Sequence, residues 1–465
     1  MPKLNKTTSA PKSFDWPLAY DGEALLRQRL ETFFVQNSFA RQLAARMHDE
    51  TGTDFFEWVD HLVLSPADQA ALVKAGFVPD RKAKTPGGEV VLEHPRASLP
   101  RVLLRRARQN PSVVAIKPEF VAEFIAANQL DVEAEGEPCS RYRRVVVAEE
   151  NGTRLEAVER RAYRGFVPAP LKHGELAAIV KVRELFSTRP RQLAQDADGI
   201  RAARKILNQV LNRVDRDVAC HLFFEAERVY WESRNGAARL QKFRQDKLGL
   251  GWGNHDHHTF RCSREHFADL NQFFGQLGFE KRERFYAGGE AGWGAQVSEQ
   301  PRNNIVIFAD VDLTPDETAI DFSVCKLPPT PQLGTVGLWV GLHGESFLQS
   351  GMHHLEARFD FNLLRDQLQS QGVNLMKPFS DFEFLRQAFT EGERWAVNPT
   401  RAERLAAAGM ITTEQRRQFV REGAIGSHLE NLQRHGGFKG FNQKAVSAII
   451  SATDPRKQTF AHASA

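Results

Sequence analysis

The chain has 465 residues, of which 42% are hydrophobic and 26% are charged, as in an ordinary globular protein. A chain of this length is expected to form two or three domains and can bury a core without disulfides or structural metals, so a bound metal would be catalytic. Its 62 basic and 58 acidic residues leave a net charge of only +4. This near balance gives no reason to expect a nucleic-acid partner, because nucleic-acid binding requires a concentrated basic face.

Residues 1–15 are polar and lack the apolar core of a secretory signal. The sequence contains no run of 18 apolar residues, so neither a transmembrane helix nor a membrane partner is expected. The four cysteines lie far apart and form no C-x-x-C pair, which excludes a zinc ribbon or a thioredoxin motif. Scattered cysteines without a signal are typical of the cytoplasm, where we expect this protein. The sequence leaves its oligomeric state open.

Residues 1–250 are predicted to form an N-terminal region that is largely helical, with some strands, and whose role the sequence does not reveal. Apolar residues recur at helical spacing over 21–50, and residues 197–245 are rich in helix-forming residues. Strands are predicted at 58–64 and twice within 87–104. Residues 143–163 form a hairpin candidate, because Asn151-Gly152 suits a type I′ turn between two alternating runs.

The composition changes near residue 250, where we place a domain boundary. From 251 the pattern runs strand, helix, strand, strand, strand, and after a proline-rich link at 326–335 a similar order recurs up to about 400. Such a repeat predicts two copies of one βαβββ module, and hence an α+β protein with a paired core over 251–400. Residues 401–465 are predicted to be a helical C-terminal extension.

Each copy carries a histidine followed four residues later by an arginine: His257 with Arg261, and His354 with Arg358. On a strand these two positions point to the same face. A single H-x-x-x-R strand is common, and its histidine is usually only hydrogen-bonded. The recurrence at matched positions makes His257 and His354 candidate metal ligands, because pairing of the two strands by pseudo-symmetry would bring the imidazoles together.

A carboxylate would complete a two-histidine-one-carboxylate site, the set that holds Fe(II) with open positions. The segment FTEGERWAV offers Glu391 and Glu393, which share a face if this segment is a strand. We take Glu391 as the metal ligand and Glu393 as a catalytic residue needed for turnover, although a register slip of one strand would exchange them. Three neighbouring histidines, His255, His258 and His353, are interpreted as core residues or as supports for the ligands.

A fainter copy is indicated in the N-terminal half. Val59-Asp60-His61-Leu62-Val63 is similar to the first strand of such a module, and residues 88–104 loosely parallel 294–308, with Glu93 matching Glu299. We interpret this region as a degenerate third module with a structural role rather than as a second metal site.

The βαβββ modules resemble the vicinal oxygen chelate superfamily, which includes glyoxalases and extradiol dioxygenases. More narrowly, the strands beginning Asp256-His257-His258 and His354-Leu355-Glu356, and the segment Phe389-Thr390-Glu391-Gly392-Glu393, are similar to motifs of the 2-oxoadipate dioxygenase/decarboxylase family. The resemblance covers roughly residues 250–400. It implies oxidative decarboxylation of a small 2-oxo acid by Fe(II) and O2.

In this hypothesis His257, His354 and Glu391 bind Fe(II), and Arg261 pairs with a distal carboxylate of the substrate through its guanidinium fork. Arg358 either binds substrate likewise or braces Glu391. Arg261 has an alternative partner within the protein, the carboxylate of Glu299. Two alternatives remain: a glyoxalase-like lyase, isomerase or hydrolase that uses Zn, Mn or Ni, with Glu393 or Glu299 as a base, and a non-catalytic binding protein on the same fold.

Overall fold

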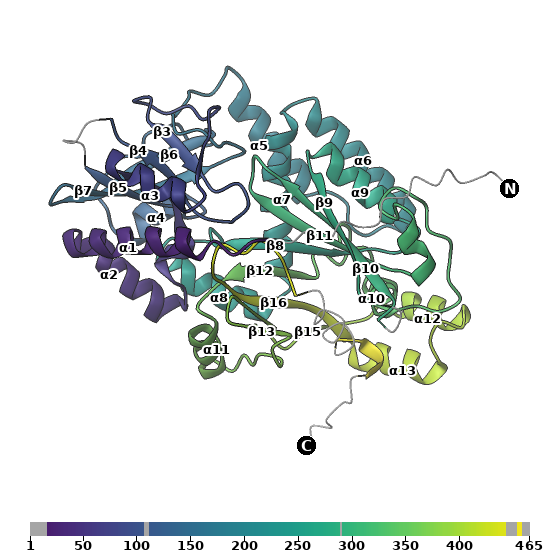
Figure 1. The fold of residues 1–465 in the computed structure, drawn as a ribbon. Coiled ribbons are helices and arrows are strands. Elements are labelled where there is room, and N and C mark those ends of the chain that lie inside the picture. The colour runs from purple at the N-terminus through teal and green to yellow at the C-terminus, as the bar shows by residue number, and fades with distance from the viewer. Residues whose placement is uncertain (1–15, 107–110, 289–290, 443–452, 458–465) are drawn as a thin grey trace.

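The computed structural model describes residues 16–106, 111–288, 291–442 and 453–457. Within these residues the strands form two mixed sheets, one of seven strands and one of nine, and helices cover both (Figure 1). The predicted α+β class is confirmed. The purple and blue N-terminal sheet lies to one side in Figure 1, and the green and yellow strands build the other sheet.

The first half of the nine-stranded sheet consists of one strand, one helix and three further strands: β8 (His255–Arg261), α9 (Phe267–Gln276), β9 (Glu280–Tyr286), β10 (Trp293–Gln300) and β11 (Ile305–Asp312). These strands lie in the order β8-β11-β10-β9, with β11 parallel to β8. Alternation along β8 turns Phe260 towards α9, where its ring lies 5.0 Å from that of Phe274. The other face of β8 carries His257, Thr259 and Arg261.

The second half repeats this order with an insertion before its last strand. Its elements are α10 (Thr335–His343), β12 (His354–Arg358), α11 (Phe361–Ser370), β13 (Ser380–Phe382), β14 (Leu385–Phe389), β15 (Glu393–Trp395), α12 (Pro399–Ala407), α13 (Thr413–Glu422) and β16 (Ala424–Arg434). The strand order is β12-β16-β14-β13, and β16 is parallel to β12. The two halves join where β12 pairs antiparallel with β8.

Strand β16 corrects the predicted boundary at residue 400. The helices α12 and α13 agree with a helical segment there, but β16 follows them and lies between β12 and β14 in the middle of the sheet. The sequence pattern does not indicate this strand, because buried positions such as His428 and Glu430 are polar and the usual apolar alternation is weak. Residues 443–452 and 458–465 of the predicted extension lie outside the described residues.

Within the described residues, the N-terminal region contains a seven-stranded sheet beside eight helices, so it has more strands than the sequence predicted. Its seven strands are β1 (Val59–Leu64), β2 (Val78–Pro79), β3 (Val90–Glu93), β4 (Arg101–Leu104), β5 (Ser112–Ile116), β6 (Tyr142–Glu150) and β7 (Thr153–Arg160). They lie in the order β2-β3-β4-β1-β5-β7-β6. Several are only two to five residues long, too short for a clear periodic pattern.

Part of this sheet has the strand order of the C-terminal halves. β1, a helix, β2, β3 and β4 follow one another, with β1 parallel to β4, and β1 pairs antiparallel with β5 as β8 does with β12. The predicted hairpin over 143–163 is confirmed as β6 and β7. Asn151 and Gly152 at its turn have φ values of 47° and 73°, the left-handed geometry that a type I′ turn needs.

Helices cover one face of the N-terminal sheet and connect it to the second sheet. Those at the N-terminal sheet are α1 (Tyr20–Gln36), α2 (Ser38–Arg46), α3 (Gln69–Lys74) and α4 (Val121–Ala127). The connection consists of α5 (Glu175–Ser187), α6 (Asp196–Leu211), α7 (Arg216–Glu232) and α8 (Gly236–Asp246). Shorter turns are η1 (Met47–Thr51), η2 (Phe55–Trp58), η3 (Pro66–Asp68), η4 (Pro315–Ala319) and η5 (Pro455–Lys457).

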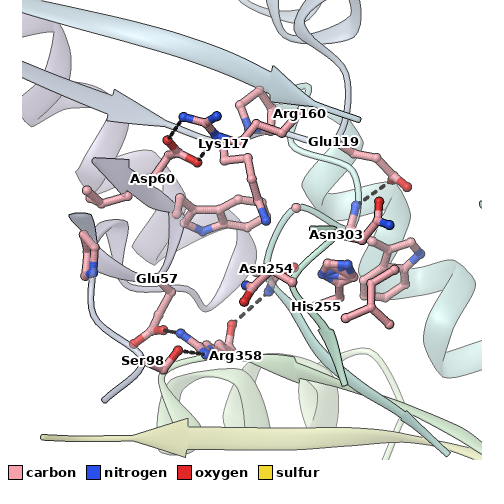
Figure 2. A pocket seen from close by; sticks show the side chains of 18 of the residues that line it. Glu57, Asp60, Ser98, Lys117, Glu119, Arg160, Asn254, His255, Asn303 and Arg358 are labelled. Carbon is pink, nitrogen blue, oxygen red and sulfur yellow. Dashed lines mark hydrogen bonds and ion pairs between the residues drawn. The ribbon is translucent and has the colours of Figure 1, made fainter. Parts of the chain in front are cut away.

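Helix α7 joins the connection to the main core, because its Phe223 and Phe224 pack against Phe273 and Phe274 of α9. The helix-rich prediction for 197–245 is thereby confirmed. A cavity of about 230 Å³ lies between the two sheets and is lined by residues of both (Figure 2). None of the described helices is long and apolar enough to cross a membrane.

Candidate metal centre

The structure brings His257 and His354 together at the centre of the nine-stranded sheet. His354 of β12 lies opposite Thr259 of β8, and Glu356 lies opposite His257, so that the two imidazoles come from neighbouring strands. Their ring centroids are 5.9 Å apart, and both side chains are almost fully buried. The antiparallel pairing of the two first strands places the histidines diagonally across one face of the sheet.

Glu430 of β16 is the carboxylate that meets them. Its Oε2 lies 3.0 Å from Nε2 of His354 and 3.8 Å from Nε2 of His257. One ligand atom from each of these three residues lies within 4.8 Å of the other two. Two imidazole nitrogens and one carboxylate oxygen at such distances make a donor set that fits a divalent transition metal.

The two glutamates proposed from the sequence lie elsewhere. β14 ends at Phe389, and the chain then leaves the sheet, so that Glu391 is exposed and accepts a 3.4 Å hydrogen bond from Nδ2 of Asn374. Glu393 accepts a 2.8 Å hydrogen bond from the backbone N–H of Gly236, at the first turn of α8. Neither carboxylate joins the group of His257 and His354, so Glu430 replaces Glu391 as the candidate ligand.

A spacing in the sequence points to Glu430. Arg434 follows Glu430 by four residues, as Arg261 follows His257 and Arg358 follows His354. The three candidate ligands therefore share one strand pattern, a ligand type followed by an arginine on the same face. The two-helix insertion α12–α13 separated this third strand from the repeat in the sequence.

The electrostatics of the group suit a cation. Burial lowers the pKa of His257 and of His354 well below that of a free imidazole, so both are neutral, the form that binds metals. Burial also raises the pKa of Glu430 well above its ordinary value. A buried, neutral carboxyl group loses its proton readily only when a positive charge arrives, so metal binding here would release a proton.

Neighbouring polar groups hold both imidazoles in place. A carboxylate oxygen of Glu356 contacts Nδ1 of His257, and Nδ1 of His353 lies 2.9 Å from Nδ1 of His354. Gln387 donates from Nε2 to Glu356 at 2.8 Å and to Glu430 at 3.1 Å. Both Nδ1 atoms are thus engaged, and the two Nε2 atoms lie nearest Glu430, that of His354 also 2.8 Å from Oγ1 of Thr259. Such outer partners fix the tautomer and orientation of metal-binding histidines.

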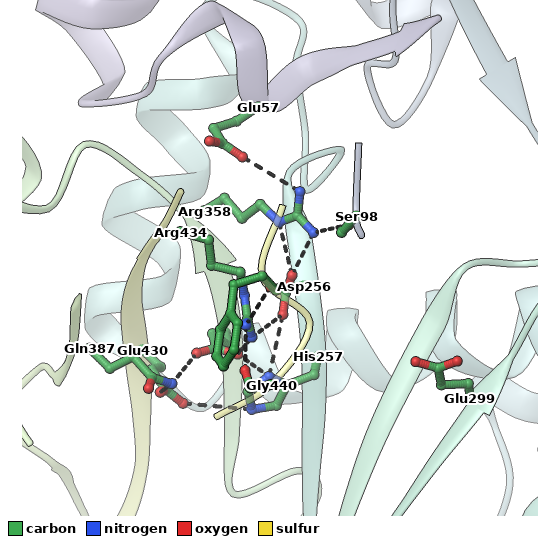
Figure 3. Close-up of polar contacts among 12 residues, drawn as sticks. Glu57, Ser98, Asp256, His257, Glu299, Arg358, Gln387, Glu430, Arg434 and Gly440 are labelled. Atoms are coloured by element: carbon green, nitrogen blue, oxygen red, sulfur yellow. Dashed lines mark hydrogen bonds and ion pairs between the residues drawn. The ribbon is translucent and has the colours of Figure 1, made fainter. Parts of the chain in front are cut away.

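A second group of possible ligands, Asp256, His257 and Glu356, lies on the Nδ1 side of His257. Its carboxylates already have cationic partners, because Arg434 lies 3.0 Å from Asp256 (Figure 3) and 3.7 Å from Glu356. Arg358 also donates to Asp256, at 2.8 Å. These arginines neutralise the negative charge that would attract a metal ion, so the His257–His354–Glu430 group is the better metal site.

Arg358 is not free to bind substrate as the sequence had suggested. Besides Asp256, its guanidinium donates to Ser98 Oγ at 2.8 Å and lies 3.6 Å from a carboxylate oxygen of Glu57 (Figure 3). It links β12 to the N-terminal sheet region through these contacts. None of these contacts is with Glu391, which accepts from Asn374, so the predicted role of bracing this glutamate is not seen.

Arg261, unlike Arg358, has guanidinium nitrogens without a hydrogen-bond partner among the described residues. Its side chain is 1% exposed, and Nε and Nη1 have no hydrogen-bond partner among the described residues. Burial lowers its pKa to about 10, and the nearest acid across the sheet, Asp310 of β11, has a pKa that burial raises to about 7. The alternative partner Glu299 instead pairs with Arg282, at 2.7 Å. Arg261 thus has donors available for an anion.

The remaining predicted histidines support the surrounding structure. His258 lies on the opposite face of β8 and packs edge-on to Phe224 of α7, with 4.9 Å between the ring centroids. His255 lines the cavity between the two sheets. A separate cavity of about 180 Å³ adjoins His257, and its basic lining residues are Arg164, Arg282, Arg358, Arg434 and Lys439. This approach to His257 favours anionic molecules.

No protein-family model and no curated protein matches the chain. Among solved structures, it is similar to methylmalonyl-CoA epimerase from Mycobacterium tuberculosis, with 14% identity and a TM-score of 0.23 over 39% of this chain and 88% of that one. It is also similar to a mutant of 4-hydroxymandelate synthase from Streptomyces coelicolor, with 13% identity and a TM-score of 0.29 over 87% and 100%. Likenesses this low show neither a family nor an activity, which must come from the site.

Proposed function

We propose that this chain is a non-haem Fe(II)-dependent oxygenase of the vicinal oxygen chelate type, which oxidatively decarboxylates a small 2-oxo acid similar to 2-oxoadipate. The observation that carries the proposal is the convergence of His257, His354 and Glu430 at the junction of two βαβββ halves. Two histidines and one carboxylate are the ligand set of Fe(II) oxygenases. When bound, Fe(II) supplies a redox centre with open positions for a 2-oxo acid and O2.

The topology supports this assignment. Both halves of the nine-stranded sheet place their first strand beside their last, and the two first strands pair with each other. Each first strand then contributes one histidine, and the last strand of the second half contributes the glutamate. This arrangement is the one that the resemblance to the vicinal oxygen chelate superfamily implies. The four free cysteines fit the proposed cytoplasmic location.

Arg261 supports a substrate with a second anionic group. It lies on the same face of β8 as His257, four residues further along the strand, and its Nε and Nη1 have no partner among the described residues. A buried guanidinium without a partner is costly, so a carboxylate at the far end of the substrate would stabilise it. The buried surroundings would meanwhile exclude water from the reacting end.

The test is anaerobic loading of the purified chain with Fe(II), followed by oxygen consumption over a panel of 2-oxo mono- and dicarboxylates. We expect turnover with a dicarboxylate, no turnover in Glu430→Gln, and normal turnover in Glu391→Gln, which removes the exposed glutamate. Activity with Zn, Mn or Ni in the absence of O2 would instead support a glyoxalase-like enzyme. The absence of bound metal and of any metal effect on the melting temperature would leave only a binding protein.

Substrate choice is tested with Arg261→Lys. Lysine keeps the charge but loses the bidentate fork, so KM for a dicarboxylate should rise by at least about tenfold while KM for a monocarboxylate changes little. Equal effects on both substrate classes would make Arg261 a structural residue and would remove the dicarboxylate from the proposal.

A further inference from the structure

The cavity between the two sheets contains a lysine that has no partner. Lys117 follows β5, and its side chain extends into the cavity, in view of Asn254 and Asn303 (Figure 2). Its amino group makes no hydrogen bond or ion pair with any described residue. Burial lowers the pKa of this amine, and the charges of Asp60 and of three nearby arginines act on it in opposite directions.

The three acids that line the same cavity all lie beside arginines, and Glu57 is 3.6 Å from Arg358. Asp60 binds Nε of Arg160 at 2.7 Å and Nδ1 of His61 at 2.7 Å. Glu119 accepts from Arg228 at 3.0 Å and from the backbone N–H of Trp252 at 2.8 Å. Asp60 acts on the amine of Lys117 only through its charge, and no ion pair joins Lys117 to these carboxylates within the described residues.

Three further polar atoms of the cavity lining are buried without a partner among the described residues. They are Nδ1 of His255, Nε of Arg228 and Oδ1 of Asn303. Native proteins satisfy nearly all buried polar atoms, so several such atoms around one space indicate a bound molecule. The cavity volume of about 230 Å³ exceeds what one water molecule needs and leaves room for a small organic ion.

We propose that this cavity is a second ligand site, distinct from the metal centre, in which Lys117 binds the carboxylate or phosphate group of a small oxyanion. The amine of Lys117 and Nε of Arg228 supply donors to the anionic oxygens, and Oδ1 of Asn303 accepts from a hydroxyl group of the ligand. The ligand lies between the sheets and contacts residues of both.

The site borders the cavity next to His257. Ser98, His255 and Arg358 line both spaces, and Arg358 binds Asp256, which precedes His257. The two sites are nevertheless separable, because Lys117 does not line the cavity at His257 and none of the three candidate ligands lines the cavity between the sheets. Anion binding at Lys117 can therefore be measured on protein from which all metal has been removed.

The experiment is calorimetric titration of the full-length, metal-free chain with inorganic phosphate and, separately, with succinate and malate. We expect one binding event per chain for at least one probe, weakened at least about tenfold in Lys117→Met, because a charged hydrogen bond is lost. Lys205→Met, which changes an exposed lysine on α6, should bind as the wild type does. Preference for phosphate or for a carboxylate identifies the anionic group, and tighter binding of malate than of succinate identifies the hydroxyl contact.

The proposal is overturned if none of the probes binds, or if Lys117→Met binds as tightly as the wild type. Removing an unpaired buried charge is not expected to unfold the chain, and Lys117→Gln provides a second variant should the methionine fail to fold. Because the titration needs neither metal nor turnover, its failure would leave the oxygenase proposal standing, and failure of the oxygenase assay would leave this site standing.

Discussion

The two sheets of this protein have related strand orders, but the corresponding faces of their first strands carry different side chains. In the nine-stranded sheet that face carries His257, His354 and Glu430, all buried. In the seven-stranded sheet it is filled by Phe166, whose ring meets that of His61 edge-on, with 4.9 Å between the centroids. A shared topology therefore supports chemistry in one sheet and only packing in the other, so function must be argued from side chains and not from strand order.

Charged side chains as well as the ring of Phe166 cover the face of the N-terminal sheet that carries His61. The guanidinium carbons of Arg101 and Arg160 lie 4.4 and 4.9 Å from the ring centroid of Phe166. Arg160 also binds Asp60, which in turn binds His61. His61 is thus committed to a hydrogen bond within the protein, as the interpretation of this region as a structural copy requires.

The largest expected effect is on metal binding, which substitutions in the nine-stranded sheet should weaken and those in the seven-stranded sheet should not. His257→Ala, His354→Ala and Glu430→Gln should each weaken binding of one equivalent of metal by more than about 100-fold, because each removes one of three ligands. His61→Ala, the matched change in the other sheet, should leave metal binding unchanged, and so should Glu391→Gln. Equilibrium dialysis with metal analysis measures this, and loss of metal in Glu391→Gln but not in Glu430→Gln would reverse the assignment.

The second prediction concerns the packing of the N-terminal sheet. Phe166→Ala should lower the free energy of unfolding by about 3–5 kcal/mol, because it removes a buried phenyl ring and leaves a cavity. Metal affinity should not change. Urea unfolding monitored by circular dichroism gives the first quantity, and dialysis gives the second. A stable Phe166→Ala variant that gains a metal site would show that the N-terminal sheet keeps a functional centre.

The sequence predicted the two strands that share a repeated pattern, and it missed the strand that an insertion separates from that repeat. His257 and His354 could be found because each lies on a first strand with an arginine four residues later. Glu430 also has an arginine four residues later, but helices α12 and α13 come between β15 and β16 and separate its strand from the repeat. The N-terminal sheet was underestimated because β2, β3 and β4 are too short to show an alternating pattern.

The third prediction concerns support of the ligands rather than the ligands themselves. Glu356→Gln should weaken metal binding by about 10–100-fold while leaving the fold intact, because the carboxylate that orients His257 is lost. Glu93→Gln, which changes an acid paired with Arg164 in the other sheet region, is the matched control and should have no effect. Unchanged metal affinity in Glu356→Gln would mean that His257 needs no such partner.

The smallest effect concerns Glu57, which faces Arg358 between the two sheets. Burial raises its pKa from 4.5 to about 7 in the folded chain. The native state therefore holds an extra proton between these pH values, and the contribution of Glu57 to stability falls as pH rises from 4.5 to 7. Relative to Glu57→Gln, the wild type should lose on the order of 2.5 kcal/mol between pH 5 and pH 8. Parallel pH profiles of the two proteins in urea unfolding would contradict this assignment.

The most direct test of the metal centre is a crystal structure of the chain loaded with metal, with anomalous diffraction recorded at the metal edge. We expect one anomalous peak at roughly 2.0–2.2 Å from Nε2 of His257, Nε2 of His354 and the carboxylate of Glu430. No peak should lie near His61 in the N-terminal sheet. A peak on the Nδ1 side of His257, between Asp256 and Glu356, or a peak at His61, would contradict the account of the two sheets given above.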